Sequence, residues 1–85
     1  MAYRVFLRRS AARELEDLTQ PIRRRVTRAI GALSNDPRPP GAKLLTRADR
    51  VWRIRVGDYR ILYLVDDDGV RVVVIRIRHR SDAYR

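Results

Sequence analysis

The chain has 85 residues, of which 45% are hydrophobic and 35% are charged, and its 20 basic and 10 acidic side chains give a formal net charge of +10. A chain of this size buries roughly 60% of its unfolded surface, so we expect one small domain over residues 1–85. The lack of cysteine excludes disulfides and thiolate metal sites, and a single histidine, His79, argues against a zinc site made by the protein alone.

The positive charge predicts the class of partner. Lys43 is the only lysine, so 19 of the 20 basic residues are arginines. A surplus of this size in a small domain indicates a polyanionic partner, most often nucleic acid. No apolar run approaches the ~20 residues that a membrane span needs, and the apolar part of the N-terminus is too short for a signal peptide. We therefore expect a cytoplasmic protein with no membrane partner.

The first part of the chain predicts a strand followed by two helices. Residues 3–8 place apolar side chains at every second position, which is typical of a short strand. Ser10 is suited to cap a helix over residues 11–18, whose apolar stripe consists of Ala11, Leu15 and Leu18. Pro21 is suited to the first position of a second helix, whose stripe consists of Ile22, Val26, Ala29, Ile30 and Leu33. Residues 35–41 hold three prolines and a glycine, which predicts a loop.

Residues 51–63 alternate like two antiparallel strands joined at Gly57 and Asp58. If these two residues form the turn, Arg55 lies opposite Arg60, and cross-strand partners share a face of the sheet. Arg53 lies on that face too. The opposite, core-facing side then receives Trp52, Ile54, Val56, Tyr59, Ile61 and Tyr63. Guanidinium groups crowded on one face are suited to bidentate contact with phosphate.

A second turn follows at residues 66–69, and two registers fit it. A two-residue loop at Asp68 and Gly69 pairs Val65 with Val72 and turns Arg76 toward the core. A three-residue loop ending at Gly69 pairs Leu64 with Val72 and Arg60 with Arg76 instead. We prefer the three-residue loop, because a core-facing arginine without a partner is costly.

The preferred register divides the outer face of the sheet into two halves. Its basic half gains Arg76 and Arg78, while Val73, Ile75 and Ile77 face the core. Its apolar half, which is too large to leave in water without a reason, consists of Leu62, Leu64, Val72 and Val74. The expected fold is α+β: an N-terminal strand, a helical hairpin and a three-stranded antiparallel meander, with the helices packed on one sheet face.

With these elements placed, the chain resembles the RelE/ParE superfamily of bacterial toxins over nearly its whole length. The resemblance rests on four pieces: the helical hairpin after a short strand, the loop at residues 35–38 followed by residues 43–45, the strand at residues 57–63, and the ending at residues 78–85. It implies a RelE-like fold and, for the RelE branch, a toxin of a type II toxin–antitoxin pair. Such a toxin is an endoribonuclease that cuts mRNA in the ribosomal A site.

The resemblance also implies site residues and partners. By motif matching, the catalytic set is Arg53, Arg55, Arg60, Arg78 and Tyr84. Further RNA contacts are expected at Lys43, Arg76, Arg80 and Arg85. An acidic antitoxin is expected to bind the apolar half of the outer face, at Leu62, Leu64, Val72 and Val74, and mRNA and rRNA complete the set of partners. The resemblance implies no metal and no cofactor.

The proposed chemistry needs a base, and the sequence leaves it unassigned. Attack of a ribose 2′-OH on the adjacent phosphate requires positive charge near the phosphorane-like transition state, a base for the 2′-OH and an acid for the leaving 5′-O. Arginine does not give up its proton, so Arg53 and Arg55 are poor bases. Tyr84 serves this role only if the arginines lower its pKa; otherwise it stacks on a base or covers the edge of the core. His79 points by strand parity to the face opposite Arg78.

Two other functions fit the same fold. A ParE-like toxin would inhibit DNA gyrase by binding it, without catalysis of its own, and an RNA-binding module would not cleave. Since one fold can host all three functions, only the site residues distinguish them. The basic positions and Tyr84 favour RNA cleavage.

Overall fold

The computed structural model describes residues 2–84, and for Ala83 and Tyr84 it describes the main chain only. In chain order the elements are β1 (Arg4–Leu7), α1 (Arg9–Asp17), α2 (Ile22–Ala32), β2 (Lys43–Thr46), β3 (Val51–Val56), β4 (Tyr59–Asp66), β5 (Arg71–His79) and the 3₁₀ helix η1 (Arg80–Tyr84). The α+β class predicted from the sequence is confirmed.

The five strands form one mixed sheet in the order β1-β5-β4-β3-β2. The predicted meander is its centre, formed by β3, β4 and β5 in antiparallel pairs. Two features were not predicted: β1 joins the far edge in parallel with β5, and β2 adds an edge strand beside β3. Parallel pairing needs a long connection between the two strands, and the helices together with β2–β4 supply it.

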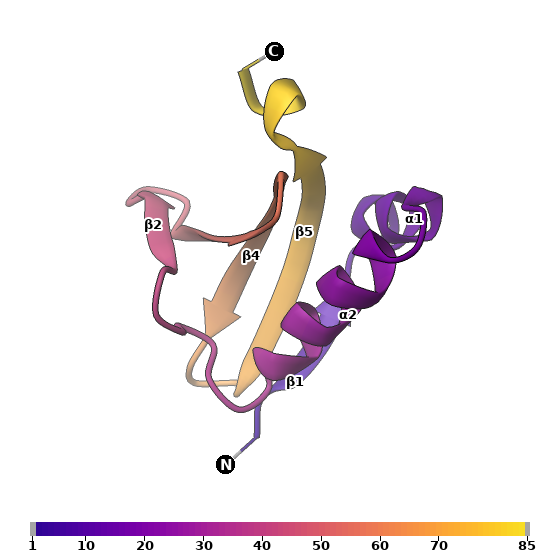
Figure 1. Ribbon diagram of the computed structural model, residues 1–85. Coiled ribbons are helices and arrows are strands. Elements are labelled where there is room, and N and C mark those ends of the chain that lie inside the picture. Colours follow the sequence, from indigo (N-terminus) through magenta and orange to yellow (C-terminus); the bar gives the residue numbers. More distant parts are fainter. Residues whose placement is uncertain (1, 85) are drawn as a thin grey trace.

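Both helices cover the same side of the sheet (Figure 1). The predicted stripes face inward, where Ala11, Val26, Ile30 and Leu33 are buried, and Leu15, Leu18, Ile22 and Ala29 pack against them. The cap predicted at Ser10 is wrong, because α1 begins at Arg9, two residues before the predicted start, with Arg8 as its N-cap. The Ser10 hydroxyl instead donates to the main-chain carbonyl of Ile75 at 3.1 Å and ties α1 to β5.

The hairpin of β3 and β4 has the predicted two-residue turn. Arg55 lies opposite Arg60, and Val56 lies opposite Tyr59, so the loop consists of Gly57 and Asp58. Gly57 has a φ of +58°, a conformation that glycine adopts without a steric penalty. The core-facing set is therefore correct, and Tyr63 and Ile61 are completely buried.

The register preferred for β4 and β5 is wrong near their turn. Val65 pairs with Val72 and Tyr63 with Val74, so both Val72 and Val74 face the core and are 0% exposed. A β-bulge between Leu62 and Tyr63 then shifts the pairing by one residue. Beyond the bulge the arginines face outward as predicted, because the extra residue restores their direction. The pairing still differs, since Arg60 lies opposite Arg78 and not opposite Arg76.

The consequences of the bulge reach both faces of β5. Ile77 faces the core, and Arg76 and Arg78 lie opposite Leu62 and Arg60 on the outer face, as predicted. Val73, predicted in the core, lies opposite Leu64 on the outer face instead. The antitoxin contact expected of Val72 and Val74 is therefore excluded, because neither side chain reaches the surface.

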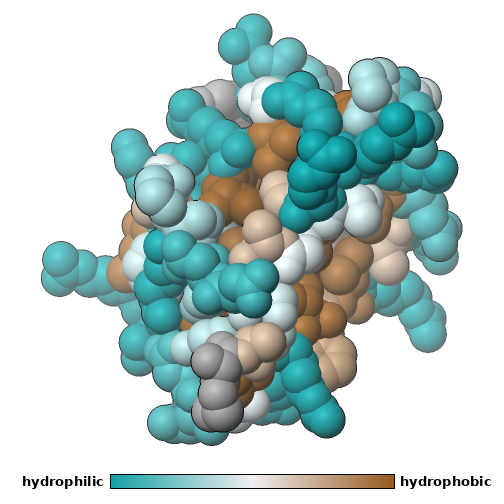
Figure 2. Space-filling view, turned by 60° about the horizontal axis from the view of Figure 1, so that its bottom comes forward, coloured by the Kyte–Doolittle hydropathy of each residue, from teal (hydrophilic) through white to brown (hydrophobic). Residues whose placement is uncertain are grey.

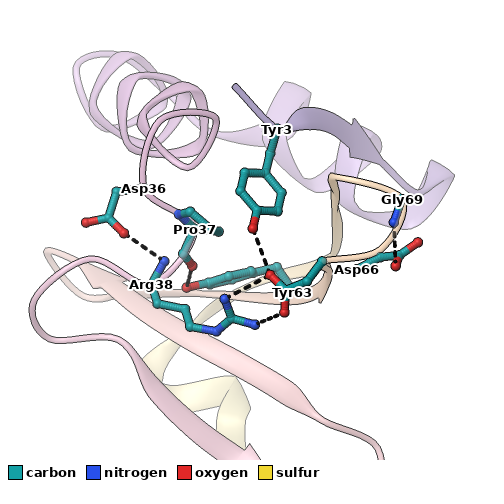
Figure 3. A network of polar contacts seen from close by, with 8 residues as sticks. Tyr3, Asp36, Pro37, Arg38, Tyr63, Asp66 and Gly69 are labelled. Atoms are coloured by element: carbon teal, nitrogen blue, oxygen red, sulfur yellow. Dashed lines mark hydrogen bonds and ion pairs between the residues drawn. The ribbon is translucent and has the colours of Figure 1, made fainter. Parts of the chain in front are cut away.

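A polar network anchors the loop at residues 35–41 to the end of the sheet that holds the β4–β5 turn (Figure 3). Arg38 donates two hydrogen bonds to Asp67, at 3.2 and 2.8 Å, and the Tyr3 hydroxyl donates to the same carboxylate at 2.7 Å. The buried Tyr63 hydroxyl donates to the Pro37 carbonyl at 2.7 Å. The Arg38 guanidinium also lies 5.2 Å from the ring centroid of Trp52, which is half-buried against the core.

Candidate nucleic-acid interface

Two rows of side chains cross the outer face of the sheet near the β3–β4 turn. The first row consists of Arg55, Arg60 and Arg78 on three neighbouring strands. The second row consists of Lys43, Arg53, Leu62 and Arg76 on four strands. The sheet thus brings together residues that lie up to 35 positions apart in the sequence, from Lys43 to Arg78, as the resemblance implied.

Arg53 is the most constrained member of these rows. Its side chain is only 6% exposed, and its Nε atom has no hydrogen-bond partner among the described residues. Burial lowers the pKa of Arg53 from its ordinary value, and the positive charges of Arg55 and Arg60 lower it further. A buried guanidinium with an unsatisfied donor and like charges beside it favours an anion nearby, since an anion would relieve all three penalties.

Arg76 occupies the predicted position, but its charge is already matched. Its guanidinium donates two hydrogen bonds to the Glu14 carboxylate of α1, at 3.2 and 3.0 Å. The other carboxylate oxygen of Glu14 accepts the main-chain N–H of Ile77 at 2.8 Å. Glu14 therefore closes the edge of β5 where β1 no longer covers it.

A cleft of about 390 Å³ opens beside the first arginine row. Its lining consists of Arg55, Gly57, Asp58, Tyr59, Arg60, Arg80 and Ser81. The main-chain N–H of Arg80 donates to the Asp58 carbonyl at 2.7 Å, and its Nε lies 4.0 Å from the Asp58 carboxylate. The β3–β4 turn and η1 are therefore joined where they line the cleft. Arg80, an expected RNA contact, lies in this part of the lining.

Positive charge continues from the cleft onto α2. One guanidinium nitrogen of Arg25 lies 3.5 Å from the place that a Cβ would occupy at Gly57, which lines the cleft. The other α2 arginines are Arg23, Arg24 and Arg28. Figure 2 shows hydrophilic side chains over most of the outline of the molecule, with apolar surface in strips between them.

His79 adjoins the cleft from the core-facing side, as its strand parity predicted. It is the register partner of Tyr59, and the two rings meet edge to face at 5.2 Å and 85°. Its Nδ1 atom lies 2.8 Å from the Ser81 hydroxyl and accepts the Ser81 main-chain N–H at 3.2 Å. Sequence reasoning placed the histidine but missed Ser81, which no strand pattern marks.

The apolar half of the outer face differs from the predicted set. Leu62 and Leu64 belong to it as predicted. The register adds Val51 on β3, Val73 on β5 and Phe6 on β1, which pairs with Val73 and is 46% exposed. We call Val51, Leu64, Val73 and Phe6 the apolar row. Sequence reasoning missed Phe6 because the parallel pairing of β1 was not predicted, missed Val73 because the preferred register was wrong, and did not assign Val51.

Two residues expected in the site lie outside this description. The side chain of Tyr84 and the whole of Arg85 are outside the described residues, so their roles stay predictions. Between residues 2 and 84, no three His, Asp or Glu side chains group as a metal site would require. No helix in the same range is long and apolar enough to cross a membrane.

Comparison with known proteins identifies the family. Residues 5–84 match the family described as the ParE toxin of a type II toxin–antitoxin system. Toxin RelG of Mycobacterium tuberculosis is 37% identical over 86 residues, which cover 100% of this chain and 99% of RelG. Among solved structures, the toxin–antitoxin complex RelBE2 of M. tuberculosis matches with a TM-score of 0.79 and 35% identity, over 94% of this chain and 100% of the other.

A second solved structure is the archaeal RelE–RelB complex of Pyrococcus horikoshii. It matches with a TM-score of 0.84 and 25% identity, over 94% of this chain and 97% of the other. The resemblance seen in the sequence is confirmed at both levels. The chain therefore belongs to the RelE/ParE superfamily and is a RelE-like toxin of the type II toxin–antitoxin class.

Proposed function

We propose that this toxin is an endoribonuclease that cuts mRNA in the ribosomal A site without a metal ion. The observation that carries the proposal is the pair of basic rows beside the cleft, above all the buried Arg53 with its unsatisfied Nε. An RNA strand laid along the outer face would bring its phosphates to Arg55, Arg60 and Arg78. Binding there would be sensitive to salt, because counterions are released from the strand.

The reaction is a transesterification within the RNA. The 2′-oxygen forms a bond to the adjacent phosphorus, the bond from phosphorus to the 5′-oxygen breaks, and the products are a 2′,3′-cyclic phosphate and a 5′-hydroxyl. Negative charge grows on the phosphate oxygens in the transition state, and fixed guanidinium groups stabilise it by on the order of 2–4 kcal/mol per well-placed donor. The arginines cannot act as the base, so another group takes the 2′-OH proton, and an acid supplies the proton that the leaving 5′-oxygen gains.

We also propose that the partner is an acidic antitoxin bound across the outer face. The two solved relatives named above are both complexes of a toxin with its antitoxin. The apolar row and Leu62 offer a surface that gains from being covered, and the net charge of +10 attracts an acidic chain.

Translating ribosomes provide the direct test of the cleavage. Purified toxin is added to them, and primer extension on the mRNA locates the 3′ ends. Cuts at the codon in the A site are expected from the wild-type protein, and none from Arg60→Ala. The control is Arg4→Ala, which removes the same charge from the same sheet face but at its far end, beside Arg71; it should cleave normally.

The family description keeps one other function open for test. The matching family carries the name of the ParE toxin, and a ParE-like toxin would bind DNA gyrase instead. Gyrase-dependent breaks in plasmid DNA, with intact mRNA on the ribosomes, would replace the ribonuclease proposal. Binding to RNA without cuts in either assay would point to the non-cleaving RNA-binding module.

A further inference from the structure

The start of η1 is held by two specific contacts. The N–H of Arg80 donates to the Asp58 carbonyl at 2.7 Å, and the N–H of Ser81 donates to the side chain of His79 at 3.2 Å. The first N–H groups of a helix find no partner inside it, and a side-chain acceptor just before the helix fixes where it begins. His79 is the residue immediately before η1, so it occupies the capping position.

The histidine is itself fixed on the sheet. Its ring and the Tyr59 ring of β4 meet edge to face at a centroid distance of 5.2 Å, and its main chain pairs with that residue. A main-chain N–H can only donate, so Nδ1 accepts the bond from Ser81 and a neutral ring carries its proton on Nε2. The Ser81 hydroxyl, 2.8 Å from the same nitrogen, then donates as well.

The capped segment forms part of the cleft. Arg80 and Ser81, the first two residues of η1, both line it, facing Arg55 and Arg60 of the hairpin. We propose that His79 is a positioning residue of the cleft: its Nδ1 caps η1 and thereby holds Arg80 and Ser81 in the wall. This inference rests on the proposed function for its effect on cleavage, and on the fold alone for its effect on η1.

Two substitutions separate the acceptor from the ring. Asparagine places an acceptor oxygen where histidine has Nδ1, and it readily bonds the main-chain N–H two residues on. His79→Asn should therefore keep the single-turnover rate near the wild-type value, although it removes the ring. Phenylalanine keeps the ring against Tyr59 but has no acceptor. His79→Phe should lose about tenfold or more, because a small displacement of a substrate-positioning group costs this much.

The structural readout is hydrogen exchange at the amide of Ser81. Exchange should be faster than wild type in His79→Phe and near wild type in His79→Asn. A proton-transfer role for the imidazole predicts instead that both variants lose cleavage with protected amides, and a packing role predicts that only His79→Asn suffers. Either pattern overturns the inference, as does equal behaviour of all three proteins.

Two further points keep the test decisive. If the variants do not fold, the ¹⁵N shifts of the histidine ring in the wild-type toxin give the answer, because an Nδ1 atom that carries the proton would contradict the cap. If the wild-type toxin does not cut mRNA on ribosomes, the proposed function fails, while amide exchange still tests the cap. If it does cut and the exchange pattern is wrong, only the cap fails.

Discussion

Arg53 differs from the other outer-face arginines because it cannot relax into solvent. Its side chain is 6% exposed and its Nε has no partner between residues 2 and 84, so its charge is maintained at a cost. Such a cost persists at functional sites where a ligand removes it. The residue is the strongest single indication that an anion binds this face, and the sequence could only place it on the correct side of the strand.

Arg78 lies in the first arginine row opposite Arg60, and its loss should affect chemistry more than stability. We expect Arg78→Ala to lower the single-turnover rate on ribosome-bound mRNA by about 10²-fold or more, because a fixed cation near the transition state disappears. The melting temperature should stay close to that of Arg4→Ala, the matched control. A rate within threefold of wild type, by the precision usual in such assays, would remove Arg78 from the site.

Tyr84 can be tested by substitutions that separate its ring from its hydroxyl. If the ring stacks on a base, Tyr84→Phe cleaves at the wild-type rate and Tyr84→Ala does not, since stacking needs only the aromatic face. If the hydroxyl transfers a proton, both variants lose cleavage. Single-turnover rates at saturating toxin measure the difference without interference from binding.

At the scale of the elements, α1 replaces a strand at the free edge of β5. Glu14 accepts the N–H of Ile77 and pairs with Arg76, and the Ser10 hydroxyl bonds the carbonyl of Ile75. An edge that already has side-chain partners cannot accept another strand, so α1 protects it from edge-to-edge association.

Glu14→Ala should therefore destabilise the fold. It leaves the N–H of Ile77 and the guanidinium of Arg76 without their partner, at a cost of about 1–2 kcal/mol. Urea denaturation followed by circular dichroism measures the change. Glu16→Ala, an exposed carboxylate on the same helix, should change the stability by less than about 0.5 kcal/mol; equal effects of the two would mean that the edge contact contributes nothing.

The loop network predicts a specific response to acid. Hydrogen bonds from Arg38 and Tyr3 lower the pKa of Asp67 from 3.8 to about 2. The folded toxin thus binds fewer protons than the unfolded chain, and the stability from this carboxylate is present above about pH 4 and lost as the pH falls toward 2.

Asp67→Asn removes this pH-dependent contribution. Urea denaturation measures the stability difference between wild type and Asp67→Asn. This difference should be constant from about pH 5 to 7, a range above the pKa of Asp67 in both the folded and the unfolded chain. It should shrink as the pH falls below about 4. Asp68→Asn, an exposed neighbour in the same turn, is the matched control for the loss of one carboxylate. A constant difference down to pH 2 would contradict the Arg38–Asp67 contact.

These elements also show where the sequence was sufficient. The turn at Gly57 and Asp58 was predictable, because a two-residue loop fixes the parity of both strands around it. The turn before β5 was not, because residues 72–75 are four consecutive apolar residues and read the same on either face. The bulge that reconciles both registers depends on tertiary packing, which no local pattern shows. The same holds for the contacts of Glu14 with Arg76 and Ile77, which lie 62 and 63 positions further along the chain.

At the scale of the whole molecule, basic charge exceeds acidic charge, and the formal net charge is +10. Among the four ion pairs found between described side chains, two hold Asp66 and Asp67 at the start of the β4–β5 turn. One sheet face presents both the basic rows and the apolar row, so an antitoxin that covers the apolar row would also lie close to the proposed RNA site.

A negative charge introduced within the apolar row should test this arrangement. Leu64 lies between Val51 and Val73 at the centre of the row, on the face that the helices leave uncovered. In Leu64→Asp, an acidic antitoxin meets a like charge and a broken apolar surface, and its affinity should fall by on the order of 100-fold, mostly through faster dissociation. Leu44→Asp is the matched control, since this exposed leucine pairs with Trp52 on the opposite face.

The same pair of variants distinguishes covering from simple attraction. Surface plasmon resonance measures both rates at increasing salt. Added salt should slow association equally for wild type and Leu64→Asp, because long-range attraction depends on the net charge. Only the dissociation rate should differ between them. The opposite result is that the antitoxin dissociates from Leu64→Asp at the wild-type rate and binds Leu44→Asp more weakly. It would place the antitoxin on the edge strand β2. Antitoxin and RNA would then not compete directly for the basic rows.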